Sequence, residues 1–199
     1  MAYSKTLFSV PNMLCYYRVA VIPVIMILLV FDGPWAAWTN VVLFTLAGVS
    51  DFLDGVIARA MKQTSLLGKF LDSSSDKILV GTMLMVLLAF DRIEGFWMIP
   101  AIIIFLREIL ISGVREFMAH YSVVVPVSRL SKWKTTTQLV FMGFLLAGPY
   151  GEMLIPHAYL IGKVGLVFAA IITVISGWDY VREALRVIQK MDAEASGTP

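Results

Sequence analysis

Residues 50–77 read SDFLDGVIARAMKQTSLLGKFLDSSSDK and set four aspartates, Asp51, Asp54, Asp72 and Asp76, into a strongly apolar chain. Ionisable groups at the edge of a hydrophobic segment are costly unless they are paired, hydrated or bound to a metal ion. We therefore expect this stretch to be the functional site. The apolar segments on both sides of it are expected to hold it in place.

The composition is that of a membrane protein. Of the 199 residues, 59% are hydrophobic and 15% are charged, whereas a soluble domain carries about 25% charged residues. The single cysteine, Cys15, excludes an intrachain disulfide framework. Because Cys15 lies among apolar residues, we expect a buried and unreactive thiol.

Six apolar runs approach or exceed the roughly 20 helical residues that are needed to cross a hydrocarbon core of about 30 Å. The first run contains Arg18 and is followed by further runs, so it is interpreted as a retained span and not as a signal peptide. The sequence predicts an all-α integral membrane domain over residues 1–190 and a polar, disordered tail over 191–199. The predicted spans are 13–31, 35–60, 69–90, 96–117, 134–149 and 158–180.

The connections between these runs divide by charge. The N-terminus, the connections 59–69 and 115–134, and the segment after residue 180 are basic, whereas the other loops are mainly acidic. With six spans, these two sets fall on opposite sides of the membrane, and the positive-inside rule places both termini in the cytoplasm. We therefore expect a multi-pass protein of the inner (cytoplasmic) membrane with a groove at its cytoplasmic face.

Helical spacing groups the polar residues on two faces. A residue advances an α-helix by 100°, so Asp51 and Asp54 share one face with small residues, and Asp72 and Asp76 share another. Four carboxylates across one groove would repel one another and take up protons unless cations resolved the repulsion. Oxygen ligands without His or Cys favour Mg²⁺, Mn²⁺ or Ca²⁺ over Zn²⁺, and two such ions can clamp a diphosphate.

Small residues accompany the carboxylates. Gly55, Ala58 and Gly68 have no side chain that would keep a nucleotide from the backbone. Close helix packing is the alternative explanation, because small residues also serve that purpose in membranes. Beside four carboxylates, the nucleotide interpretation is favoured.

The spacing of these residues resembles a family signature. The pattern Asp51-x2-Asp54-Gly55-x2-Ala58-Arg59-x8-Gly68-x3-Asp72-x3-Asp76 resembles that of the CDP-alcohol phosphotransferases, integral membrane enzymes that make phospholipids. Pro11, Asn12 and Arg18, together with residues 107–119 and 131–135, are similar to the bacterial members that make phosphatidylglycerophosphate. The chain departs from the family pattern at residues 73–75, which are all serine, and at Cys15, where Thr is common.

The resemblance implies a reaction and its cofactors. It implies transfer of the phosphatidyl group from CDP-diacylglycerol to glycerol 3-phosphate, with release of CMP and with two divalent cations, Mg²⁺ or Mn²⁺. Asp76 is the implied general base. The implied metal ligands are Asp51, Asp54, Asp72 and Asp76, and the implied CDP-diacylglycerol-binding residues are Asp54, Gly55, Ala58, Arg59, Gly68 and Asp72.

Four cations are candidates for binding the acceptor phosphate: Arg107, Arg115, Lys132 and Lys134. Placing a cation near hydrocarbon costs free energy, and charge-assisted hydrogen bonds to a phosphate would offset this cost for all four side chains. Two alternatives stay open, because Arg107 can pair with a carboxylate such as Glu108 and the lysines can bind anionic headgroups.

Two other functions compete with this prediction. A cation channel or carrier would place its acids near the middle of the membrane, within reach of both sides, whereas here the acids gather at one side. A sister transferase with another acceptor, of the cardiolipin or inositol-phosphate type, is the main rival within the family. Membrane lipids and a second copy of the chain, in a homodimer, are the expected partners, and nucleic acid is not.

Overall fold

A computed structural model describes residues 9–60, 66–121 and 129–195 of the protein. Two short 3-10 helices in these ranges, η1 (Gly95–Trp97) and η2 (Gly148–Met153), lie in the connections. The prediction of six helical segments is confirmed. The α-helices are α2 (Val10–Val30), α3 (Pro34–Ala60), α4 (Leu66–Ala89), α5 (Met98–His120), α6 (Arg129–Ala147) and α7 (Ala158–Ala195).

Three helices are long and apolar enough to cross a membrane by themselves. Their apolar windows are Asn12–Val30, Gly95–His120 and Ala158–Met191. Helices α3, α4 and α6 are less apolar, because α3 and α4 carry the aspartates of the central stretch and α6 carries a row of Thr, Lys and Gln residues. The membrane class predicted from composition is thereby supported.

The last helix is longer than the sequence predicted. Helix α7 continues to Ala195 instead of ending at residue 180, so residues 191–195 of the tail are helical and the prediction of disorder is wrong there. The reason is an apolar side that continues past the span, because Ala184, Val187 and Ile188 pack with Met118 of α5. Residues 196–199 lie outside the described residues.

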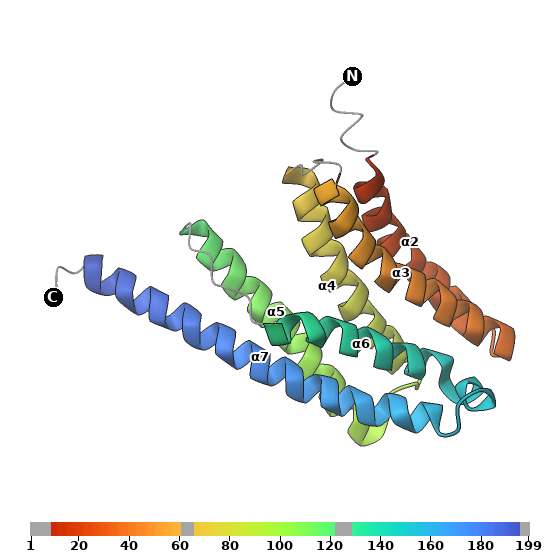
Figure 1. Ribbon diagram of the computed structural model, residues 1–199. Coiled ribbons are helices and arrows are strands. Elements are labelled where there is room, and N and C mark those ends of the chain that lie inside the picture. Colours follow the sequence, from red (N-terminus) through yellow and green to blue (C-terminus); the bar gives the residue numbers. More distant parts are fainter. Residues whose placement is uncertain (1–8, 61–65, 122–128, 196–199) are drawn as a thin grey trace.

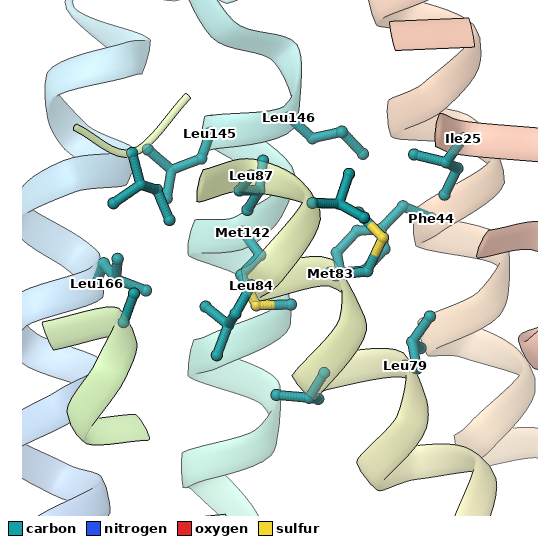
Figure 2. Close-up of a cluster of buried hydrophobic side chains, with 14 of the residues drawn as sticks. Ile25, Phe44, Leu79, Met83, Leu84, Leu87, Met142, Leu145, Leu146 and Leu166 are labelled. Atoms are coloured by element: carbon teal, nitrogen blue, oxygen red, sulfur yellow. The ribbon is translucent and has the colours of Figure 1, made fainter. Parts of the chain in front are cut away.

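The helices form two groups that meet along α4, α5 and α6. Helix α2 packs against α3 and α4, α5 packs against α7 and contacts α4, and α6 contacts α3, α4 and α7. Figure 1 shows α2, α3 and α4 together, with α5 between α4 and α7 and with α6 crossing in front of α5. The core between the groups is built from Ile25, Phe44, Leu79, Met83, Leu84, Leu87, Met142, Leu145, Leu146 and Leu166 (Figure 2).

The helix ends that carry the predicted site residues meet at one end of the bundle. The end of α3, the start of α4 and the end of α5 lie at the same end of the molecule, together with the start of α2 (Figure 1). The aspartates of α3 and α4 are therefore carried at the end toward which α5 also runs.

Polar contacts between the loops stabilise the opposite end of the bundle. Arg92 lies 3.8 Å from Asp32 (Nη2 to Oδ1), and the Tyr150 hydroxyl donates a hydrogen bond of 3.0 Å to the same carboxylate. The Tyr159 hydroxyl donates to the Arg92 carbonyl at 2.8 Å. Gly148 has a φ of 57°, and a Cβ atom there would lie 2.2 Å from the Arg92 guanidinium. Glycine is favoured at this position, because it adopts left-handed backbone without strain and leaves room for the Arg92 guanidinium.

Candidate active site

The aspartates lie on the two helices that the sequence predicted. Asp51 and Asp54 belong to the C-terminal half of α3, and Asp72 and Asp76 belong to the N-terminal half of α4. Because both segments are α-helical, the spacing of four residues places Asp72 and Asp76 one turn apart on one face. The structure describes residues 51–60 of α3 only as helix. Outside the described side chains lie those of Asp51, Asp54, Ala58 and Arg59, and nothing further is described of Gly55.

A buried arginine meets two of these carboxylates. Arg18 of α2 has no exposed surface. Its guanidinium pairs with the carboxylate of Asp76, and its Nη2 atom lies 3.6 Å from Oδ1 of Asp72. An arginine inside a membrane helix is expected to pair with an acid, and this was the signal available in the sequence. The resemblance included Arg18 but gave it no partner.

The serines between the last two aspartates lie within the helix. Ser75 is buried, and its hydroxyl donates a hydrogen bond of 3.2 Å to the carbonyl of Asp72. A serine side chain that bonds back to the preceding turn is an ordinary way to satisfy a hydroxyl in a helix. Cys15, the other departure from the family pattern, is buried as expected.

The donor chemistry here fits hard divalent cations. The Asp72 and Asp76 side chains are 51% and 37% exposed, so each carboxylate can still reach a ligand. Among the side chains described, which do not include the α3 aspartates, no three or more His, Cys, Asp or Glu residues are grouped so that they could hold a metal ion. The two predicted metal ligands whose side chains are described, Asp72 and Asp76, offer carboxylate oxygens, which Mg²⁺ and Mn²⁺ prefer.

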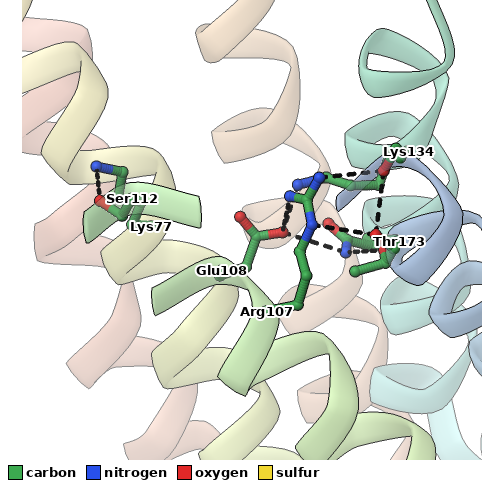
Figure 3. A network of polar contacts seen from close by, with 8 residues as sticks. Lys77, Arg107, Glu108, Ser112, Lys134 and Thr173 are labelled. Carbon is green, nitrogen blue, oxygen red and sulfur yellow. Dashed lines mark hydrogen bonds and ion pairs between the residues drawn. The ribbon is translucent and has the colours of Figure 1, made fainter. Parts of the chain in front are cut away.

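Arg107 is fastened between two helices. Its Nε donates to the Thr173 carbonyl at 3.1 Å and one of its terminal nitrogens donates to the Ser176 hydroxyl at 3.1 Å, both on α7. Its other terminal nitrogen lies 3.5 Å from Oε1 of Glu108 (Figure 3). Pairing with Glu108, the alternative that the sequence left open, is therefore present. Its binding to an acceptor phosphate stays a prediction.

Lys134 meets the same carboxylate from α6. It is buried, and its ammonium pairs with Oε1 of Glu108. The Gln138 amide, one turn further along α6, donates to Thr173 Oγ1 at 2.9 Å and to Glu108 at 3.5 Å. Gln138 and Thr173 are thus site residues that sequence reasoning did not single out, and Glu108 was named only as a possible partner of Arg107. Figure 3 shows Glu108, Lys134 and Thr173 converging from α5, α6 and α7.

The remaining two predicted phosphate ligands are Arg115 of α5 and Lys132 of α6. Arg115 is exposed, about two turns beyond Glu108 on α5, and its guanidinium carbon lies 5.8 Å from the centre of the Tyr180 ring. Lys132 lies in the first turn of α6, and its side chain is outside the described set. Arg115 is thus the described cation of the four with the greatest access to a ligand.

A lysine joins the two halves of the site. Lys77 follows Asp76 on α4, and its ammonium donates a hydrogen bond to the Ser112 hydroxyl of α5 and lies 3.9 Å from Glu116. Ser112 lies one turn beyond Glu108 on α5. The contact therefore joins α4, which carries Asp72 and Asp76, to α5, which carries Arg107 (Figure 3). Carboxylates that suit a hard cation and basic side chains that suit an anion are thus carried on neighbouring helices.

Comparisons with known proteins identify relatives of this chain. Residues 8–176 match the CDP-alcohol phosphatidyltransferase family. A CDP-diacylglycerol–glycerol-3-phosphate 3-phosphatidyltransferase of Rickettsia bellii is 39% identical over 174 residues, which cover 87% of this chain and 94% of the relative. A Haemophilus influenzae protein of the same name is 37% identical over 89% of this chain and 94% of its own length. A rice cardiolipin synthase (CMP-forming) is 35% identical over 92% of this chain and 60% of its own length.

Proposed function

We propose that this chain, which belongs to the CDP-alcohol phosphatidyltransferase family, transfers the phosphatidyl group of CDP-diacylglycerol to sn-glycerol 3-phosphate and releases CMP. The observation that carries the choice of acceptor is the extent of the similarity. Relatives named for this reaction align over 94% of their own length, whereas the cardiolipin synthase aligns over 60% of its length. The family membership also favours an enzyme over a cation channel or carrier.

The acidic residues are proposed to serve the donor. Asp51, Asp54, Asp72 and Asp76 would hold two divalent cations, Mg²⁺ or Mn²⁺, which when bound neutralise and polarise the diphosphate. Arg18 contributes by fixing Asp72 and Asp76 from the side of α2. The residues proposed to line the CDP-diacylglycerol site are Asp54, Gly55, Ala58, Arg59, Gly68 and Asp72.

The transfer itself requires one bond to form and one to break. A hydroxyl oxygen of glycerol 3-phosphate attacks the phosphorus that carries the diacylglycerol. The bond from this phosphorus to the bridging oxygen breaks, and CMP leaves. The carboxylate of Asp76 accepts the hydroxyl proton as general base. Positioning is the main contribution of the protein, as in other phosphoryl transfers.

The cationic residues are proposed to serve the acceptor. Arg115, Lys132 and Lys134 are the proposed ligands of its phosphate, with Arg107 close behind them in the bundle. A phosphate monoester carries about two negative charges near neutral pH, and Arg and Lys form charge-assisted hydrogen bonds to it. Of the described cations, Arg115 is the most accessible, whereas Arg107 already donates to α7 and Lys134 pairs with Glu108.

The orientation and assembly of the protein are also proposals. The basic connections support a cytoplasmic location for both termini and for the site, and we propose a homodimer in the inner membrane. A cysteine introduced by Lys62→Cys in a Cys15→Ser background should react with an impermeant thiol reagent only from the cytoplasmic side. Labelling from outside intact cells would overturn the orientation.

An acceptor panel tests the proposed function. Purified full-length protein in lipid nanodiscs would receive CDP-diacylglycerol and Mg²⁺ with glycerol 3-phosphate, phosphatidylglycerol or inositol 1-phosphate, and CMP release would be measured. The proposal predicts turnover with glycerol 3-phosphate. Turnover with phosphatidylglycerol or inositol 1-phosphate alone would make the protein one of the sister transferases, and cation flux without CMP release would favour the carrier.

A further inference from the structure

A single carboxylate oxygen lies at the centre of the polar network inside the bundle. Oε1 of Glu108 contacts Arg107 at 3.5 Å, Gln138 at 3.5 Å and the ammonium of Lys134. We propose that Glu108 is a positioning residue of the acceptor site, which keeps Lys134 charged and directed toward the acceptor phosphate. The inference rests on the proposed function and deepens it, because it assigns a role to a carboxylate that binds neither substrate.

The network fixes Glu108 from three helices. Arg107 holds the carboxylate from one side and is itself bound to Thr173 and Ser176 of α7. Gln138 of α6 bridges Glu108 and Thr173. A carboxylate held in this way defines where an ammonium that pairs with it must lie, since neither side chain is free to move toward water.

The charge of Lys134 depends on this pair. The Lys134 side chain is 7% exposed, and a buried ammonium is costly unless an anion pairs with it. The charges that act on it are Glu108, Arg107 and Arg115 of α5, while Gln138 and Thr173 add only neutral groups from α6 and α7. Glu108 is therefore the one negative charge among these facing groups. Without it, two cations would favour an uncharged amine.

The pair leaves Lys134 able to bind a ligand. An ammonium group has three N–H donors, and the carboxylate of Glu108 takes one of them. Glu108 is the acceptor described for this ammonium, and we assign the two other donors to oxygens of the acceptor phosphate. An uncharged lysine offers a much weaker contact to a phosphate dianion than an ammonium does, so the effect of Glu108 on the acceptor passes through Lys134.

The test is the Michaelis constant for glycerol 3-phosphate as a function of pH. At about pH 8.5 the Glu108→Gln variant is expected to raise this KM at least about tenfold, which corresponds to about 1.4 kcal/mol. The ratio to the wild-type value should shrink toward about pH 6, because protons recharge Lys134. Dividing the variant KM by the wild-type KM at the same pH removes the effect of the ionisation of glycerol 3-phosphate, which is common to both proteins. The KM for CDP-diacylglycerol should change by less than about twofold.

Two variants serve as controls. Glu108→Asp keeps a carboxylate and should recover most of the wild-type KM. Glu183→Gln removes an acid of α7 whose side chain is 43% exposed and pairs with Arg186 away from the site, and it should leave the ratio of variant to wild-type KM near one at every pH.

A double-mutant cycle separates this role from a purely structural one. If Glu108 acts through Lys134, the variant that combines Glu108→Gln with Lys134→Met should have the same acceptor KM as Lys134→Met alone. Its melting temperature should exceed that of Glu108→Gln, because the buried ammonium of Lys134 is no longer left without its carboxylate, although Arg107 has lost the same partner in both variants. Effects on KM that multiply, or a KM ratio independent of pH, would overturn the inference. Wild-type protein that fails to use glycerol 3-phosphate would instead overturn the proposed function, and the inference with it.

Discussion

Arg18→Met should lower activity far more than stability. Arg18 is completely buried and pairs with two of the predicted metal ligands, Asp76 and Asp72. Breaking a buried ion pair costs about 3–5 kcal/mol. Here the two carboxylates are 51% and 37% exposed and water can solvate them, so the expected loss of unfolding free energy is about 1–2 kcal/mol.

The effect on catalysis is expected to be larger, because Arg18 orients two acids at once. A hydrogen bond to a charged group contributes about 1.5–3 kcal/mol, so loss of the contact to Asp76 should lower kcat by about 10- to 100-fold. Methionine keeps the apolar stem of the side chain and limits the cavity. CMP release would be measured alongside thermal unfolding of the same nanodisc samples.

Arg186→Met is the matched control, because Arg186 pairs with Glu183 at 3.2 Å on the exposed side of α7. An exposed pair of this kind contributes at most about 1 kcal/mol, so kcat should be unchanged. Wild-type kcat in Arg18→Met would refute the reasoning that Arg18 positions the acids. A fall in kcat fully explained by unfolded protein would refute it as well.

Three further predictions concern metal, acceptor and packing. Asp72→Asn should abolish CMP release while the protein stays in the membrane, and wild-type turnover that persisted in EDTA would exclude the proposed metal site. Arg115→Ala and Lys134→Ala should each raise the KM for glycerol 3-phosphate at least about tenfold with little change for CDP-diacylglycerol; equal effects on both substrates, rescued by anionic lipid, would instead indicate headgroup anchoring. Gly165→Ala would place a Cβ atom 2.0 Å from the Phe141 ring, so it should lower the unfolding free energy by about 1–3 kcal/mol, and an unchanged melting temperature would contradict this packing of α6 on α7.

Hydropathy was sufficient to predict the helices but not all of their ends. The six apolar runs correspond to α2 through α7, and a segment that lies in a membrane must satisfy its own backbone hydrogen bonds, as a helix does. The end of α7 was missed because its last turns bury apolar side chains such as Ile188 against α5. Such a continuation has polar residues between the apolar ones, and a span prediction based on mean hydropathy stops before it.

Spacing along one helix predicted part of the site. It placed Asp72 and Asp76 on one face, because helical geometry fixes residues four apart. It did not predict the pairing of Arg18 with Asp76, since the two residues are 58 positions apart and belong to different helices. Their contact depends on how α2 packs against α4.

The polar network was harder still to predict. Residues adjacent in a helix do not face each other, so nothing in the sequence required Arg107 and Glu108 to join one network. The long Arg107 side chain lies against α7 because residue 177 is glycine, where a Cβ atom would stand 2.9 Å from its Nε. Thr173 and Ser176 complete the network from a helix that the sequence treated only as a span.

The most direct test of the account is the stoichiometry of the reaction. Purified wild-type protein in nanodiscs, with CDP-diacylglycerol, glycerol 3-phosphate and Mg²⁺, should form CMP and phosphatidylglycerophosphate in equal amounts, with both products quantified by mass spectrometry. Neither product should form with Asp72→Asn or without glycerol 3-phosphate. CMP formed without the lipid product, or at the same rate without glycerol 3-phosphate, would contradict the proposed transfer.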